Sequence, residues 1–333
     1  MAGRGRDGHL RNTSVERLRR NLVLALALGV AVYLILAVLS DLGDLAAALD
    51  SFDYALVPAI LGLVALSYVV RFLRWTYYLR VLKVSVPTGI NAAIFTSGLS
   101  MTISPGKLGE VLKCVFVRRV TGAPIARTAP AVVAERATDG TGMVLWGFLG
   151  AFALDIPPWT MLVFLALAIF GIAVLRSERL SMAAERVLSG LPLVNRLAPH
   201  LRVFHGASNE LLGTRPLLVG TALSFFSWGL ECAGVYLCAV GLGVDLPFLL
   251  IVFVFALSSL VGVLSMLPGG IGAVEAGLYG QFVAVANLST GLAGALTLVI
   301  RLATLWFATL LGICGLLLVR YLLGDASIEP DET

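Results

Sequence analysis

Eight charged residues lie within or beside long apolar runs of this 333-residue sequence. They are Lys107, Glu110, Glu135, Arg136, Asp139, Glu231, Glu275 and Arg301. A charged side chain at the centre of a bilayer costs about 2.5–3.5 kcal/mol on insertion scales, so each such residue needs a partner, water or a function. Carboxylates pair with cationic groups, and Arg and Lys bind phosphate. We interpret the eight residues as candidate ligands of a polar lipid headgroup or its phosphate.

Three of these residues share one segment. Glu135 and Asp139 are four residues apart and therefore lie on one face of a helix. Arg136 precedes Asp139 by three residues, a spacing at which the two side chains can pair. The segment is interpreted either as part of a binding site or as an ion-pair network with only a structural role.

The remaining charges have alternatives of their own. Glu231 and Arg301 are expected either to contact a substrate or to compensate each other's charge. Arg71 and Arg74, at the end of an apolar run, are expected either to act in the site or to extend to the lipid headgroups, as long basic side chains do near helix ends.

Two Pro-Gly motifs interrupt apolar segments at corresponding places. They are SPGKLGE (Ser104–Glu110) and LPGGIGAVE (Leu267–Glu275). Pro cannot continue a helix and Gly permits tight turns, so each motif predicts a break within a re-entrant helical hairpin, over about 90–117 and 247–286. The residues predicted to form the breaks are Pro105, Gly106, Gly109, Pro268, Gly269, Gly270 and Gly272. Basic residues flank the first hairpin but not the second, which predicts opposite entry sides.

The composition identifies the elements that must position these residues. Hydrophobic residues make up 59% of the chain and charged residues 13%, whereas a soluble domain has about 25% charged residues. The sequence therefore predicts an all-α polytopic membrane protein and excludes a soluble enzyme, a disordered chain and a β-barrel, which shows short alternating segments. The net charge of +4 is attributed to membrane topology and anionic lipid, without a nucleic-acid partner.

Apolar runs and the Lys/Arg bias predict the topology. A basic segment (1–20) and an acidic tail (324–333) are placed in the cytoplasm, on either side of one membrane domain over 21–323. Section 176–215 has apolar residues at helical spacing and is predicted to lie on the cytoplasmic surface of the cell membrane. Six crossing helices are predicted at about 22–39, 54–73, 130–154, 160–175, 217–242 and 292–319.

Motifs for metal or nucleotide chemistry are not found in the sequence. The four cysteines form no CxxC pair, and neither HExxH nor a Gly-rich loop ending in GK[ST] occurs. We predict no catalytic residue, no metal and no cofactor.

Four stretches carry a resemblance to a known family. RFLRW (Arg71–Trp75), SPGKLGEVLK (Ser104–Lys113), ERATD (Glu135–Asp139) and LPGGIGAVE resemble the lysylphosphatidylglycerol synthase transmembrane region, also called the flippase-like membrane domain. The resemblance covers about Asn21 to Leu323. It implies a lipid-handling protein, and the chain is expected to be a stand-alone member without the aminoacyl-transferase domain.

These observations together predict a lipid flippase. Two broken segments in oppositely oriented halves are typical of inverted-repeat transporters with a central site. The lipid is expected to be a phospholipid, an aminoacylated lipid or a polyprenyl-linked lipid, and membrane lipids are the expected partners. Two alternatives stay open: a membrane-embedded enzyme that uses Glu135 and Asp139 as metal or acid–base carboxylates, and an accessory subunit of a separately encoded lipid-modifying synthase.

Overall fold

The computed structural model describes residues 42–104, 110–154 and 198–324, with scattered positions among 29–40 and 159–169. Every regular element in this part of the chain is a helix, which confirms the predicted all-α class. Three helical stretches are long and apolar enough to cross a membrane: 54–81, 214–241 and 290–323. Most of the predicted spans 22–39 and 160–175, segment 1–20 and nearly all of the tail lie outside the described residues.

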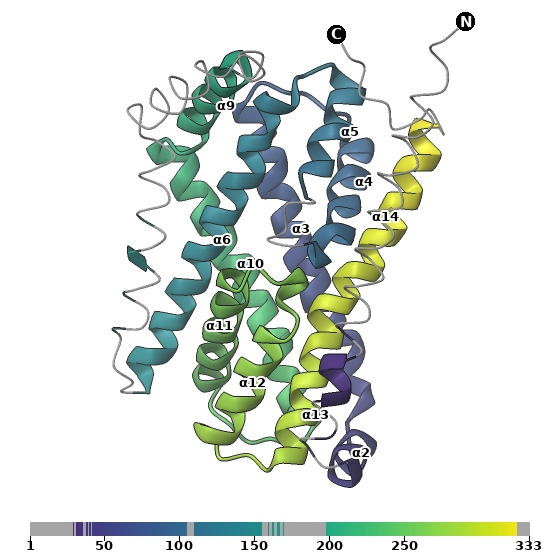
Figure 1. The fold of residues 1–333 in the computed structure, drawn as a ribbon, viewed down its shortest axis with the longest axis vertical. Helices are drawn as coiled ribbons and strands as arrows, with labels where there is room; N and C mark the ends of the chain where they lie inside the picture. The colour runs from purple at the N-terminus through teal and green to yellow at the C-terminus, as the bar shows by residue number, and fades with distance from the viewer. Residues whose placement is uncertain are drawn as a thin grey trace, which may run out of the picture.

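The described elements follow one another as a series of long helices separated by short ones (Figure 1). They are α2 (Leu42–Asp50), η1 (Tyr54–Leu56), α3 (Val57–Val81), α4 (Thr88–Leu99), η2 (Ser100–Ile103), α5 (Leu112–Thr121), α6 (Ile125–Ala153), α9 (Ala198–Leu211), α10 (Thr214–Gly241), α11 (Phe248–Leu264), η4 (Pro268–Gly270), α12 (Ala273–Ala284), α13 (Thr290–Arg301), the π-helical turn η5 (Leu302–Trp306) and α14 (Phe307–Leu323).

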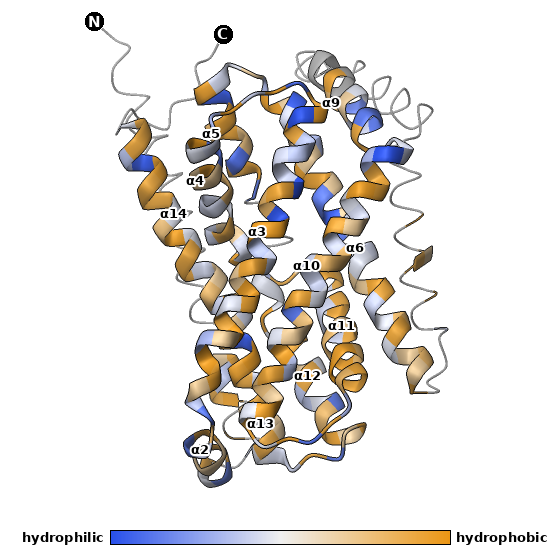
Figure 2. Ribbon diagram, turned by 180° about the vertical axis from the view of Figure 1, so that it is seen from behind, coloured by the Kyte–Doolittle hydropathy of each residue, from blue (hydrophilic) through white to orange (hydrophobic). Residues whose placement is uncertain are grey.

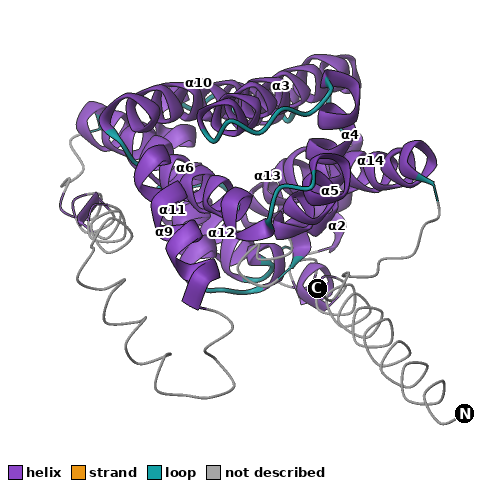
Figure 3. Cartoon of the chain, turned by 90° about the horizontal axis from the view of Figure 1, so that it is seen from above, coloured by secondary structure: helices purple, strands orange, loops and turns teal. Residues whose placement is uncertain are grey.

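Two long helices, α3 and α10, pack side by side along much of their length (Figure 3). They run in opposite directions, since α3 begins near α2 and α10 begins near α9 (Figure 1). Helix α6 has 29 residues and is therefore about 43 Å long at the helical rise. It carries the charged residues Glu135, Arg136 and Asp139 near its middle. Hydrophobic residues cover most of the helices (Figure 2).

Two helical hairpins enter the bundle from opposite ends (Figure 1). We call α4 with α5 hairpin 1, and α11 with α12 hairpin 2. Hairpin 1 packs through α4 on α14, and hairpin 2 packs through α11 on α6. Both contacts need a glycine, because a Cβ on Gly312 would collide with the backbone nitrogen of Ser100, and a Cβ on Gly150 would lie 2.7 Å from the carbonyl oxygen of Leu249.

The turns that lead into the two hairpins have the same geometry. Lys83 ends the turn after α3 with φ 57°, and Gly243 ends the turn after α10 with φ 68°. In both turns the next amide donates to the carbonyl five residues earlier at 2.9 Å, as in a Schellman motif. Pro87 and Pro247 then cap the first hairpin helices with nearly identical dihedral angles.

The tips of the hairpins meet inside the bundle. Ile103 of hairpin 1 packs against Ile271 of hairpin 2 and Leu305 of η5. The break in hairpin 2 falls at the predicted glycines, since Gly269, Gly270 and Gly272 have φ of 61°, 65° and 92°. Its helices end at Leu264 and resume at Ala273 on either side of Pro268, which begins η4. The other predicted breaks, Pro105, Gly106 and Gly109, lie outside the described residues.

Charge differs between the two ends of the bundle. The connections 82–87, 122–124 and 212–213 lie at the end that holds α9 (Figure 1), and Lys83, Arg127 and Arg215 lie in or beside them. The connections 51–53, 242–247 and 285–289 lie at the opposite end; the first two contain one aspartate each, and none of the three contains Lys or Arg. Which end faces the cytoplasm stays a prediction from the Lys/Arg bias.

Candidate functional site

A cavity of about 280 Å³ lies where the two hairpins approach α3, α6 and α10. Six of the eight predicted site residues line it: Glu110, Glu135, Arg136, Asp139, Glu231 and Arg301. Glu275 does not line the cavity but bonds to Arg301, which does. Lys107 lies outside the described residues.

One ion-pair cluster joins three long helices around Asp139 of α6. Arg74 of α3 donates from Nη1 to Asp139 Oδ1 at 2.6 Å, and Ser224 Oγ of α10 donates to the same oxygen at 2.8 Å. Arg136 Nη2 lies 3.0 Å from Asp139 Oδ2. Arg74 is 1% exposed and Asp139 4% exposed, so the two charges balance each other away from solvent. The predicted pairing of Arg136 with Asp139 is present.

A second cluster ties hairpin 1 to α6. Lys113 Nζ donates to Glu135 Oε2 at 2.6 Å and lies 3.6 Å from Glu110 Oε2. The Glu110 carboxylate also lies 3.3 Å from Arg136 Nη2. The ammonium group of Lys113 sits 4.5 Å from the centre of the Trp75 ring, a favourable cation–π position. Ion pairs from Glu110 and Lys113 to Glu135 and Arg136 therefore hold hairpin 1 against α6.

A third contact links α3 and α10 beside the same cavity. Arg71 forms an ion pair with Glu231 through its Nη2 atom. The Arg71 guanidinium carbon also lies 4.9 Å from the centre of the Trp228 ring and 5.6 Å from that of Tyr68. The pair and its aromatic neighbours form one wall of the cavity.

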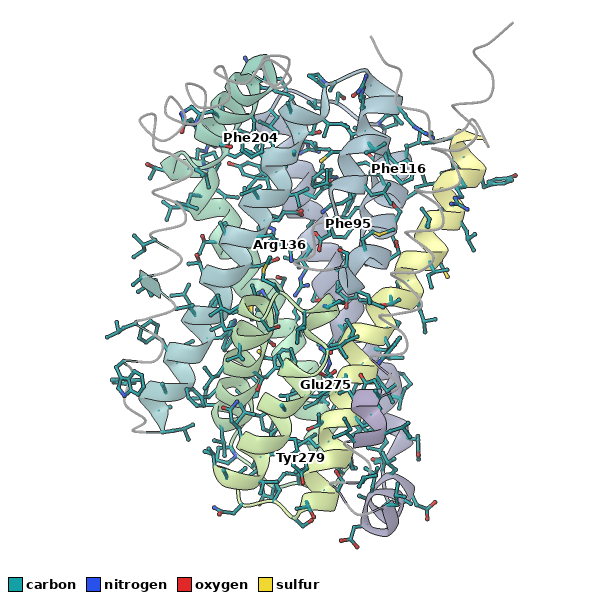
Figure 4. All side chains as sticks on the ribbon, viewed as in Figure 1. Phe95, Phe116, Arg136, Phe204, Glu275 and Tyr279 are labelled. Carbon is teal, nitrogen blue, oxygen red and sulfur yellow. The ribbon has the colours of Figure 1, made fainter. Side chains whose placement is uncertain are left out.

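A fourth contact fixes the tip of hairpin 2. Arg301 Nε donates to Glu275 Oε1 at 2.7 Å, and its Nη2 donates to the carbonyl of Gly269 at 2.9 Å. Glu275 Oε2 in turn accepts from the amide of Gly272 at 2.7 Å, so the carboxylate also caps α12. In Figure 4 Arg136 lies above Glu275, and both lie between the two ends of the bundle.

The observed pairs differ from the predicted ones in three places. Glu231 and Arg301 do not compensate each other, because they pair with Arg71 and Glu275 instead. Arg74 does not extend to the headgroups, because it is fully enclosed by the Asp139 cluster. Glu110 and Glu275, interpreted from the sequence as candidate headgroup ligands, already contact protein cations.

Sequence reasoning also missed one residue of the site. Lys113 lines the cavity, is 2% exposed and pairs with two carboxylates. Its signal was its position three residues after Glu110, the same i,i+3 spacing that predicted the pair within α6. Among the described residues no group of three or more His, Cys, Asp or Glu is arranged to hold a metal ion.

The helical bundle and its charged interior define a membrane protein with a polar site among apolar helices. The family profile of the lysylphosphatidylglycerol synthase TM region matches residues 23–312, and the chain belongs to this family. It is also similar to UPF0104 membrane proteins. One, from Methanothermobacter thermautotrophicus, is 30% identical over 269 residues, which cover 73% of this chain and 77% of that protein. Another, from Pyrococcus horikoshii, is 26% identical over 285 residues, covering 77% and 84%.

Proposed function

We propose that this protein moves a polar-headgroup lipid between the leaflets of the cell membrane. The observation that carries the proposal is the charged cavity among apolar helices, at the place where two hairpins meet. A lipid that crosses a bilayer must bring its headgroup through a region that disfavours charge, while its acyl chains can stay in lipid. A polar cavity of this kind shelters the headgroup.

The proposal includes an inverted repeat. In this arrangement α3, hairpin 1 and α6 correspond to α10, hairpin 2 and the stretch formed by α13, η5 and α14. The matching turns after α3 and α10, and the opposite entry of the hairpins, support it. So do the reciprocal contacts of α4 with α14 and α11 with α6. In transporters with inverted repeats, irregular helix ends near the midplane form the substrate site, and one repeat rocks against the other.

The ion pairs suggest how the hairpins move in this mechanism. Arg136 holds hairpin 1 through Glu110, and Arg301 holds hairpin 2 through Glu275 and Gly269. A bound headgroup competes for these arginines and releases one hairpin at a time, so that the cavity opens to one leaflet and then to the other. For this to happen, the headgroup must bind the state with a released hairpin more tightly than the state in which both hairpins are held.

Leaflet exchange in liposomes tests the proposal. The full chain is reconstituted with a fluorescent phospholipid in both leaflets, and a reducing agent that cannot cross the bilayer quenches the outer one. We expect quenching to proceed beyond the outer leaflet, with the lipid recovered chemically unchanged. The variant Arg320→Gln changes a charge outside the cavity, at the far end of α14, and should exchange the lipid as fast as the unaltered protein. Exchange no faster than in protein-free liposomes refutes the flippase; a converted lipid would instead support the enzyme alternative.

A further inference from the structure

A second cavity lies between α3 and the stretch formed by α13, η5 and α14. Its volume is about 470 Å³, within the range of about 300–1,000 Å³ that is usual for ligand pockets. Among the residues that the structure describes, it shares no lining residue with the charged cavity. Turn η5 separates the two, because Thr304 and Leu305 line the charged cavity. Leu302 and Trp306 line the second cavity, which we call the lateral pocket.

The lining of the lateral pocket is apolar. No described lining residue is charged, and only Tyr54 and Trp306 carry a polar side-chain atom. Both of these donors are already engaged. The Tyr54 hydroxyl donates to the carbonyl of Leu49 at 3.0 Å, and the Trp306 indole donates to the hydroxyl of Tyr33 at 2.8 Å. Burying a polar group without a hydrogen-bond partner costs free energy, so the pocket suits a hydrocarbon group.

The position of the lateral pocket identifies the source of that hydrocarbon. The two helical stretches that flank it, 54–81 and 290–323, are long and apolar enough to cross a membrane. Leu302 and Leu310 line the pocket and are 51% and 63% exposed, so it opens on a surface that faces lipid. Leu298 and Leu310 are twelve residues apart, about 18 Å along a helix, which is close to half of a hydrocarbon core of about 30 Å. The pocket therefore has the length of a lipid chain in one leaflet.

We propose that the lateral pocket binds one hydrocarbon chain of a membrane phospholipid, and that this chain braces hairpin 2. Tyr54 begins η1 near α2, at one end of the bundle (Figure 1), and tyrosine favours the level of the lipid headgroups. The chain runs from there towards Trp306 and Leu310. An empty pocket would leave these apolar side chains without dispersion partners on one side.

Trp306 connects the lateral pocket with the tip of hairpin 2. Its indole N–H donates to the Tyr33 hydroxyl, which donates in turn to Glu275 Oε1 at 3.4 Å. Glu275 is the carboxylate that bonds to Arg301 and caps α12. A chain that packs against the Trp306 ring therefore restricts the side chain that holds Tyr33 beside hairpin 2. This inference goes beyond the proposed transport, because a resident lipid can occupy the pocket whether or not the charged cavity carries one.

Photolabelling in vesicles tests the binding site. The full chain is reconstituted in phosphatidylcholine that contains a trace of phosphatidylcholine with a diazirine in the middle of one acyl chain, and the labelled residues are mapped by mass spectrometry. We expect labels to concentrate in segments 54–61 and 298–310, at a higher level than on equally exposed leucines of the same helices outside the pocket. Labelling in proportion to exposure alone would mean ordinary contact with the bilayer and overturns the proposal.

Two leucine substitutions provide a matched pair. Leu310→Phe enlarges a side chain of the pocket lining, so the labels in segment 54–61 should be lost. Leu317→Phe adds the same bulk to the same helix outside the pocket, at nearly equal exposure (61% against 63%), and should keep them. Val57→Phe fills the pocket from α3 and repeats the test if Leu310→Phe folds poorly.

Two results of this comparison overturn the site. The first is undiminished labelling of the pocket in both filled variants. The second is a pocket without labels in a protein that forms dimers in the vesicles, which assigns the pocket to a second copy of the chain.

Amide hydrogen exchange tests the link to hairpin 2. Exchange in segment 267–275 is measured in a sterol-based detergent, whose rigid rings do not replace a flexible chain, with and without added phosphatidylcholine. We expect the lipid to slow this exchange in the unaltered protein and in Leu317→Phe, but not in Leu310→Phe. Tyr33→Phe removes only the linking hydroxyl, so it should keep the photolabels and lose the effect of lipid on hairpin 2. Labelling of the pocket without any effect of lipid on segment 267–275 would keep the site and overturn its role as a brace.

Discussion

Arg136 and Arg301 occupy the same position in two different helices. Each is the twelfth residue of its helix, counted from Ile125 in α6 and from Thr290 in α13. Each contacts a carboxylate of the hairpin that precedes its helix in the chain. The contacts differ in strength, because Arg301 makes two hydrogen bonds and its side chain is 7% exposed, whereas that of Arg136 is 33% exposed and lies 3.3 Å from Glu110.

The first prediction follows from this difference. Arg301→Gln removes the partner of buried Glu275 and should destabilise the protein by about 3–5 kcal/mol, as breaking one side of a buried ion pair does. Arg136→Gln should lower stability less, because that side chain is more exposed and Glu110 keeps Lys113 nearby. Both should slow leaflet exchange. Denaturant unfolding in detergent measures the free energy of unfolding of each variant. An equal loss of this free energy in both variants would contradict the expected difference between Arg301 and Arg136.

A second prediction concerns the cluster around Asp139. Asp139→Asn leaves the Arg74 charge buried without its carboxylate and should also cost about 3–5 kcal/mol. Ser224→Ala removes one hydrogen bond to the same carboxylate and should cost roughly 1–2 kcal/mol. The same unfolding measurement distinguishes them, and a larger loss in Ser224→Ala than in Asp139→Asn would mean that the carboxylate is not the centre of the cluster.

The third prediction concerns the break in hairpin 2. Gly272 has φ 92°, a conformation that L side chains rarely adopt, so Gly272→Ala should be strained by about 1–3 kcal/mol, although the added methyl would meet only Val32 Cγ2 at 3.6 Å, an ordinary contact. Gly280→Ala, in the middle of α12 with open space beside it, is the control and should be neutral or stabilising. Thermal unfolding compares the two, and equal melting temperatures would show that hairpin 2 tolerates a different break.

The fourth prediction concerns orientation. In a Cys314→Ser background, which removes the exposed cysteine, new cysteines at Lys83 and Arg127 should react only with reagents on the cytoplasmic side. Cysteines at Asp53 and Asp245 should react only from outside, because the positive-inside rule places the basic end of the bundle in the cytoplasm. Labelling of Lys83 and Asp245 from the same side would contradict the topology.

The family was predicted from the resemblance of four sequence stretches. Hydropathy and local spacing predicted the helical class and the charged residues that meet at the cavity. They also predicted the contact of Arg136 with Asp139, because those residues are three apart in one helix. They did not predict the contact of Arg71 with Glu231, whose members are 160 residues apart. Such partners depend on how α3 and α10 pack, and a single sequence does not record that packing. From the sequence alone, Glu231 is expected either to contact a substrate or to compensate Arg301, and its partner Arg71 is not indicated.

The π-helical turn η5 fixes the rotation between α13, whose Arg301 bonds to hairpin 2, and α14, which packs on hairpin 1. It follows Arg301 directly and precedes α14, whose Gly312 touches the backbone of hairpin 1 at Ser100. Removing one residue from η5 would rotate α14 by about 100° relative to α13, so that Gly312 would turn away from Ser100 while Arg301 kept its place. Single-residue deletions here should therefore uncouple the two hairpins without unfolding either one.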